Sequence, residues 1–148
     1  MALSISPAQL DMVLEHGEQA YPHECCGLLL GSLEEGGRRR ICAIHRMRNA
    51  NTASPRNRFD FDPKEHLEAQ RAARARGVDI VGFYHSHPDH PARPSQYDLD
   101  HAAWPGYSYL IVAIHGGARV SVEGANSFEL ADDRSQFLSE SIECVQDV

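Results

Sequence analysis

Long apolar runs are absent from this 148-residue sequence, and no stretch approaches the roughly 18 consecutive apolar residues that a membrane-spanning helix requires. We therefore expect no membrane association. Cysteine is also scarce, with four residues and no C-x-x-C pair. Cys25 and Cys26 are adjacent within an apolar run, which suits buried thiols better than a disulfide framework and indicates a reducing compartment. A redox role for these two residues is the alternative.

Basic residues are fewer than acidic ones, with 14 Lys and Arg against 21 Asp and Glu, and the net charge is −7. This balance argues against nucleic acid as a partner. The charge is unevenly spread, since residues 38–76 hold 11 of the 14 basic residues and only four acids. Solvated arginines on unrelated faces explain such a stretch, and a docking surface for an acidic protein is the sharper alternative.

The N-terminal segment MALSISPAQLDM lacks the basic start and the long apolar stretch of a secretory signal, so we expect a cytoplasmic protein. Hydrophobic residues make up 42% of the chain and charged residues 24%, which is typical of a folded protein. The length and composition predict a single domain over residues 1–148, with a core at about 5–131 and a C-terminal tail at 132–148.

Local patterns predict helices placed among several strands. N-cap residues, prolines and apolar residues at helical spacing predict three helices, at 7–21, 63–76 and 95–103. Short apolar runs bounded by glycine and other turn residues predict strands at 25–31, 39–46, 79–87, 107–115, 119–122 and 127–131. The tail from Asp132 is predicted to be weakly helical. This order favours an α+β or α/β sandwich, with one mixed sheet flanked by helices.

The segment HSHPDHPARPSQYD, residues 85–98, carries the side chains that point to chemistry. His85 and His87 are two residues apart, so on a strand both imidazoles face the same side of the sheet. Ser95 and Asp98 are three residues apart, so on a helical turn both lie on one side. The proline-rich loop between the two pairs can fold that turn back over the histidines. We therefore expect two imidazoles and one carboxylate to converge.

Two histidines and a carboxylate with an open fourth position form the ligand pattern of a catalytic zinc ion. Hydrolysis of an amide at such a site also needs a base, and Glu24, just before an apolar strand, is the candidate. Ser95 can donate its hydroxyl to the oxyanion that forms at the carbonyl. Plainer interpretations exist for the same residues, with Ser95 and Asp98 as a helix N-cap pair and Glu24 as a surface acid.

Other histidines and the single tryptophan receive no functional role. A lone histidine is more often structural or exposed than a ligand. The histidines left unassigned on this ground are His16, His23, His45, His66, His90, His101 and His115. Trp104, which precedes Pro105, is interpreted as a packing residue rather than a platform for substrate.

Glu24 before CGLLLG, then His85-x-His87, seven residues, Ser95, two residues and Asp98 resemble the JAMM motif of the MPN/Mov34 (PAD-1) metalloprotease family. The segments PHECCGLLLG, FYHSHP and YSYLIVAI are also similar to prokaryotic members of the family. The resemblance implies an MPN/JAMM-like (cytidine-deaminase-like) sandwich and a hydrolase that uses one zinc ion. It also implies that His85, His87 and Asp98 bind the zinc, that Glu24 acts through the bound water and that Ser95 stabilises the oxyanion.

The leading hypothesis for function is a zinc metallopeptidase or isopeptidase that cuts at the C-terminal tail of a ubiquitin-like protein. Prokaryotic members of the family include enzymes that process ubiquitin-like sulfur-carrier proteins. An extended tail suits a groove at a strand edge, where main-chain hydrogen bonds hold the substrate. Two alternatives are a non-catalytic MPN-type scaffold that binds protein partners and a zinc-dependent amidase that acts on small molecules. An accessible groove favours peptides, and a closed pocket favours small molecules.

Overall fold

The structure is a computed structural model that describes residues 2–145. Its elements follow one another as β1 (Ala2–Ile5), α1 (Pro7–Ala20), β2 (Cys26–Leu33), a short 3-10 turn (Glu35–Gly37), β3 (Arg38–Met47), α2 (Pro63–Ala75), β4 (Asp79–Pro88), α3 (Gln96–His101), β5 (Ser108–His115), β6 (Ala118–Arg119), β7 (Ala125–Leu130) and β8 (Phe137–Cys144). None of the helices in the described residues combines the length and the apolar character needed to cross a membrane.

The two long helices begin where their capping residues predict. At α1, the Ser6 hydroxyl accepts a hydrogen bond from the Gln9 N–H, and the Gln9 side chain accepts one from the Ser6 N–H. At α2, the Asp62 carboxylate accepts from the Lys64 N–H. Both helices have a proline in their first turn, where the missing N–H costs no intrahelical bond. The predictions for these two helices are confirmed.

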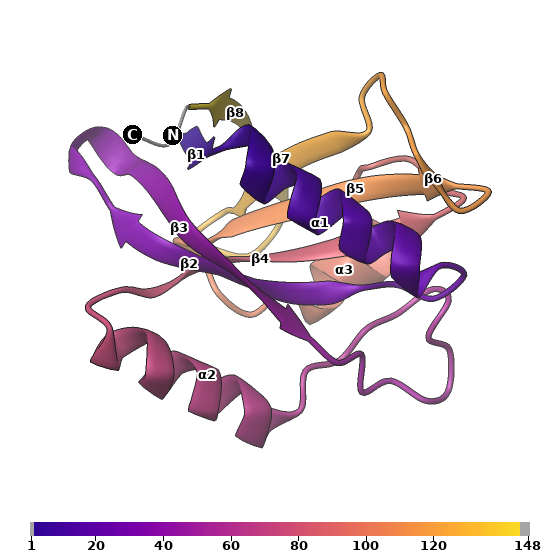
Figure 1. Cartoon of the computed structure of the whole chain (residues 1–148), viewed down its shortest axis with the longest axis horizontal. Helices are drawn as coiled ribbons and strands as arrows, with labels where there is room; N and C mark the ends of the chain where they lie inside the picture. Colours follow the sequence, from indigo (N-terminus) through magenta and orange to yellow (C-terminus); the bar gives the residue numbers. More distant parts are fainter. Residues whose placement is uncertain (1, 146–148) are drawn as a thin grey trace.

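The strands form one mixed sheet in the order β4-β2-β3-β1-β8-β7-β5-β6, and β4 also pairs with β5. The sheet therefore closes on itself into a barrel, whereas the sequence predicts a sandwich in which helices flank one mixed sheet. Closure depends on β1, which is hydrogen-bonded in parallel to β3 on one side and to β8 on the other. Figure 1 shows β1 and β8 side by side although they come from opposite ends of the chain. The expected α+β class and mixed sheet are confirmed, and the expected sandwich is corrected to a closed sheet.

The tail is a strand where the sequence analysis predicts weak helix. Residues Phe137–Cys144 form β8, which pairs antiparallel with β7 and parallel with β1. Half-buried positions alternate with exposed ones near the middle of this strand, at Glu140 and Ile142, so one face turns inward. The buried partner of Glu140 is Arg39 on β3, a contact between distant parts of the chain that no local pattern reveals.

Two apolar clusters pack on opposite sides of β2 and β4, because alternate residues of these strands face opposite ways. On one side, Val13 of α1 packs with Leu29 and Tyr84. On the other side, Ala73 of α2 packs with Leu28 and Phe83. In Figure 1, α1 and α2 accordingly lie on opposite sides of these strands. Burial on both faces makes β4 a central strand, and its C-terminal end carries the candidate site.

The basic stretch at 38–76 is divided among several faces of the molecule. Four of its arginines form ion pairs, in Arg38–Glu143, Arg39–Glu140, Arg48–Asp62 and Arg74–Asp79. Arg39 is buried within the closed sheet, with 2% of its side chain exposed. These pairs favour the interpretation of separate arginines over one continuous docking surface for an acidic protein.

The cysteines pack as the sequence predicts. Cys25 and Cys26 are buried, and all four cysteines are free thiols. Burial, the largest cause, raises the pKa of Cys25 to about 12, so its thiol stays protonated. A buried, protonated thiol is a poor nucleophile, and the packing interpretation is therefore favoured over the redox alternative.

Candidate metal centre

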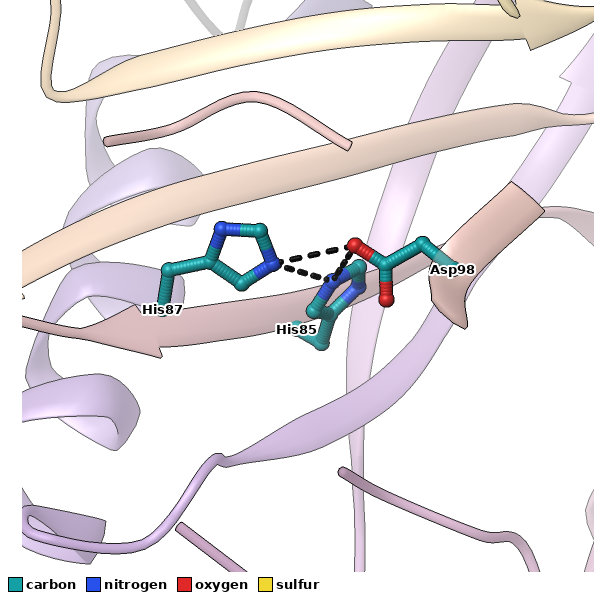
Figure 2. A group of neighbouring side chains, drawn as sticks. All are labelled: His85, His87 and Asp98. Carbon is teal, nitrogen blue, oxygen red and sulfur yellow. Dashed lines mark hydrogen bonds and ion pairs between the residues drawn. The ribbon is translucent and has the colours of Figure 1, made fainter. Parts of the chain in front are cut away.

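The two histidines of the motif lie at the C-terminal end of β4 and face the same way. Both are buried, and their Nε2 atoms are 3.1 Å apart. Pairing fixes the strand on both sides, with His85 opposite Cys26 of β2 and His87 opposite Ala113 of β5. Figure 2 shows both rings pointing toward the carboxylate of Asp98. The alternation of side chains along a strand thus brings the two imidazoles together, as predicted.

Asp98 reaches the histidines from α3, and the same residues cap that helix. The Ser95 hydroxyl accepts from the Asp98 N–H at 3.0 Å, and Asp98 Oδ2 accepts from the Ser95 N–H at 2.9 Å. Asp98 Oδ2 also lies 3.3 Å from His85 Nε2 and 3.1 Å from His87 Nε2. The N-cap interpretation and the convergence of Asp98 with the histidines therefore both hold, because the cap fixes the carboxylate that faces the imidazoles.

These three side chains fit a small divalent cation. Among the described residues, they form the group of His, Cys, Asp or Glu side chains whose ligand atoms lie close enough together to hold a metal ion. Zinc bonds of about 2.0–2.1 Å at tetrahedral angles place neighbouring ligand atoms roughly 3.3 Å apart. The three separations, of 3.1, 3.1 and 3.3 Å, are close to that spacing. Their assignment as metal ligands remains a prediction that the geometry supports.

The hydrogen bond at the far side of His87 sets its tautomer. His87 Nδ1 lies 2.8 Å from the carbonyl oxygen of Pro91. A carbonyl only accepts, so Nδ1 carries the hydrogen and Nε2 presents a lone pair to the centre. Such a partner on the second ring nitrogen is typical of metal-binding histidines. The sequence analysis did not single out Pro91, since a backbone acceptor leaves no residue-type signal.

Burial and mutual charge set the ionisation of the centre. Burial lowers the pKa of His85 more than the nearby charge of Asp98 raises it, which favours a neutral imidazole. Burial alone would raise the pKa of Asp98, but the interactions with His85 and His87 and the hydrogen bond from the Ser95 N–H outweigh it and lower that pKa. A neutral imidazole and an ionised carboxylate are the forms that bind a metal ion.

Glu24 lies just before β2, and the pairing of β2 with β4 brings it toward the centre. Cys26 is opposite His85, and the Ser86 N–H donates to the Cys25 carbonyl at 3.2 Å. Continuing this register by one residue places Glu24 opposite His87, on the same face of the sheet. The structure thus brings the strand of Glu24 beside that of His85, as expected from the sequence.

The Glu24 carboxyl is buried, with 3% of the residue exposed, so the surface-acid interpretation is wrong. Its Oε1 has no hydrogen-bond partner within the described part of the chain. Burial, and then the charge of Asp98, raise the pKa of Glu24 to about 9. A buried carboxyl oxygen without a partner is costly unless a ligand satisfies it, so Glu24 stays a candidate functional residue.

Ser95 is exposed, and its hydroxyl oxygen accepts the capping hydrogen bond from Asp98. A hydroxyl that accepts one hydrogen bond keeps its own hydrogen for another acceptor. The geometry is therefore compatible with donation to an oxyanion, and this role of Ser95 stays a prediction.

Two residues that support the site were missed by the sequence analysis. The ring of Phe59 packs against His85, with ring centroids 4.7 Å apart. The Asn49 side chain donates to the Glu24 carbonyl at 3.1 Å and so ties the loop after β3 to the start of β2. Both lie in a segment that the sequence patterns leave as loop, and their contacts depend on the tertiary fold.

The expected groove at a strand edge is not formed by β4. Residues 79–85 of β4 pair with β2, and residues 82–88 pair with β5. Both edges of the strand are therefore paired over residues 82–85, where an extended substrate cannot add to β4. A substrate must be held there by other contacts.

Comparisons with known proteins find similar sequences and a similar solved structure. A desampylase of Haloferax volcanii is 37% identical over 118 residues, which cover 77% of this chain and 82% of the relative. A Thermus thermophilus protein, named a probable TtuB-protein conjugate cleaving protease, is 35% identical over 68 residues, 46% of this chain and 45% of that protein. The solution structure of a Desulfitobacterium hafniense protein has a TM-score of 0.83 and 32% identity, covering 99% of this chain and 94% of that one.

Residues 6–130 match the family described as prokaryotic homologs of the JAB domain. This span contains Glu24, His85, His87, Ser95 and Asp98. The match agrees with the JAMM/MPN resemblance in the sequence and with the structural similarity over nearly the whole chain. This protein therefore belongs to the family of prokaryotic JAB-domain proteins.

Proposed function

We propose that this protein is a zinc-dependent isopeptidase or peptidase that cuts at the C-terminal tail of a ubiquitin-like or sulfur-carrier protein. The observation that carries the proposal is the convergence of His85, His87 and Asp98 on one face, beside the buried Glu24 carboxyl. Family membership supports a hydrolase, and two relatives are named as a desampylase and a protease that cleaves TtuB conjugates.

The residues divide the work of amide hydrolysis among them. His85, His87 and Asp98 would hold the zinc ion, which supplies Lewis-acid polarisation of the carbonyl and lowers the pKa of water. Glu24 accepts a proton at its free Oε1 as water is activated and passes it to the leaving nitrogen. Ser95 donates its hydroxyl to the negative charge that develops on the carbonyl oxygen.

The alternative of a non-catalytic scaffold has no support in the site. Such a scaffold needs neither a buried acid without a partner nor three converging ligand atoms, and this chain has both. Burying these polar groups costs stability, which a purely structural core would avoid. The alternative of a small-molecule amidase uses the same site and differs only in substrate.

The test pairs metal content with turnover. The zinc-loaded enzyme is incubated with conjugates of ubiquitin-like carriers, and mass spectrometry detects the released products. We expect His87→Ala to lose zinc, whereas Glu24→Gln keeps zinc and loses activity by about 10²–10⁴-fold, the usual contribution of a general acid or base.

Full zinc occupancy in His87→Ala would refute the ligand assignment. Undiminished turnover in Glu24→Gln would remove Glu24 from the mechanism, and undiminished turnover in Ser95→Ala would remove the oxyanion role. Absence of any released product from the zinc-loaded wild type, on conjugates and on free carriers alike, would refute the proposed activity itself.

A further inference from the structure

A cavity of about 670 Å³ opens beside the metal centre. Its walls come from the loop before α2, from α2 itself, from β4 and β5, from the segment around α3 and from β8. Seven of its lining residues are Phe, Tyr or Trp, and these are Phe59, Phe61, Phe83, Tyr97, Trp104, Tyr109 and Phe137. A concave and largely apolar space of this size is typical of a ligand-binding site.

The cavity and the metal centre share walls. His85 and Asp98 line the cavity and also belong to the group of converging ligand atoms. The ring of Phe59, another lining residue, packs against His85. A group that fills this cavity therefore lies directly next to the residues that we assign to hydrolysis.

Apolar surface at this cavity stays exposed to water in the free protein. Leu67 is 45% exposed and Trp104 is 43% exposed. Trp104 does pack, as the sequence indicates, because it stacks on Phe83 with ring centroids 5.1 Å apart. Nearly half of its surface nevertheless remains open, and covering such surface is favourable. The packing interpretation of Trp104 is thus correct but incomplete.

The polar lining residues of the cavity include the carboxylates of Asp60 and Asp98, and most of the remaining lining is uncharged. His66 packs edge-on against Trp104, and burial lowers its pKa, which favours the neutral imidazole. The Arg58 guanidinium does not line the cavity. It lies 4.5 Å from the ring centre of Tyr97, which does line the cavity. The interior is therefore dominated by uncharged rings, which bind an apolar side chain best.

We propose that this cavity binds a large apolar side chain, preferentially an aromatic one, of the polypeptide substrate, close to the bond that is cut. That this side chain belongs to a substrate rests on the proposed function. Because both edges of β4 are paired over residues 82–85, main-chain pairing with that part of the strand cannot hold the substrate. A side chain bound in the adjoining cavity holds the substrate instead and would set the sequence preference of cleavage.

The test uses metal-free protein, so that binding is measured without turnover. Trp104 is the only tryptophan, and its fluorescence therefore reports on the cavity directly. The probes are blocked pentapeptides of glycine with a central Phe, Lys or Gly. We expect the Phe peptide to bind at least about tenfold more tightly than the Gly peptide, because a whole aromatic side chain leaves water.

A matched pair of variants locates the binding. Leu67→Ser removes apolar surface at the cavity and should weaken binding of the Phe peptide about threefold to tenfold. Leu33→Ser makes the same change at a leucine that is 65% exposed and does not line the cavity, and it should leave binding unchanged. Equal effects of the two substitutions would overturn the assignment of the cavity.

Further outcomes of these experiments separate this inference from the proposed function. Equal binding of the Phe and Gly peptides, tighter binding of the Lys peptide, or binding of N-acetylphenylalaninamide as tight as that of the Phe peptide would each overturn the inference. The last result would indicate a small-molecule ligand. Selective binding of the Phe peptide by a protein that, when loaded with zinc, releases no product would instead refute the proposed activity and leave the apolar binding site standing.

Discussion

Glu24 occupies an environment that disfavours its ionised form in the metal-free protein. The carboxyl is buried, its Oε1 has no hydrogen-bond partner among the described residues, and its pKa is raised to about 9 by burial and by the charge of Asp98. In the unfolded chain the same group titrates near 4.5. Between these two values the folded state binds one more proton than the unfolded state, so folding stability falls as pH rises. A cation at the centre would relieve this cost.

Glu24→Gln should therefore stabilise the metal-free protein increasingly as pH rises from 4.5 toward 9. The amide keeps the shape of the carboxyl but has no ionised form to penalise. We expect a gain of at least about 1 kcal/mol at pH 8 and a smaller one at pH 5. Urea unfolding at the two pH values measures it, with Glu68→Gln on the exposed face of α2 as the control. A gain in stability that does not grow with pH would show that ionisation of Glu24 is not penalised in the folded protein.

At the scale of elements, the sequence indicates the site better than it indicates the sheet around it. The S-x-x-D spacing predicts both a helix start and a carboxylate facing the histidines, and α3 uses Ser95 and Asp98 for both. The helix itself has six residues and none that is buried. Tertiary packing therefore contributes little to α3, and the capping box holds the first turn and the Asp98 carboxylate in place.

Ser95→Ala should weaken zinc binding although Ser95 is not a proposed ligand. Loss of the cap costs about 1 kcal/mol of helix stability, which corresponds to roughly a fivefold lower affinity if Asp98 is placed by the cap. Ser95→Asn keeps a side-chain acceptor suited to the N-cap and should restore most of the affinity. Competition with a chelator at fixed pH measures both variants. Equal zinc affinities of the wild type and Ser95→Ala would show that another contact places Asp98.

At the scale of the whole molecule, the parts that sequence reasoning missed are those with distant partners. Ala2 of β1 pairs with Arg38 on one side and with Ser141 on the other, and a four-residue strand has too few positions to show a period. The cavity was missed for the same reason, since Phe59, Trp104 and Phe137 meet only after the sheet closes. The central strands and the convergence of His85, His87 and Asp98 were predictable because their signals are local.

The contact that joins these distant parts is a buried ion pair, and its removal should destabilise the whole fold. Arg39 of β3 donates to the Glu140 carboxylate of β8 at 3.2 Å, and their side chains are 2% and 0% exposed. Arg39 also donates to Ser108 of β5, to the Glu129 carboxylate of β7 and to the carbonyl of Gly106, so one guanidinium links four strands of the closed sheet. Its removal leaves a buried carboxylate without its cation, which is more costly than the loss of the pair as a unit.

Arg39→Met should lower the free energy of unfolding by about 3 kcal/mol or more, as is usual when one partner of a buried pair is removed. The neighbouring Arg38→Met removes an exposed pair with Glu143 and should cost less than about 1 kcal/mol. The double variant Arg39→Met/Glu140→Met should be more stable than Arg39→Met alone, because no buried charge is left at position 140. Urea unfolding measures the free energy of unfolding of the three variants. Equal losses for Arg38→Met and Arg39→Met would show that closure of the sheet does not depend on this pair.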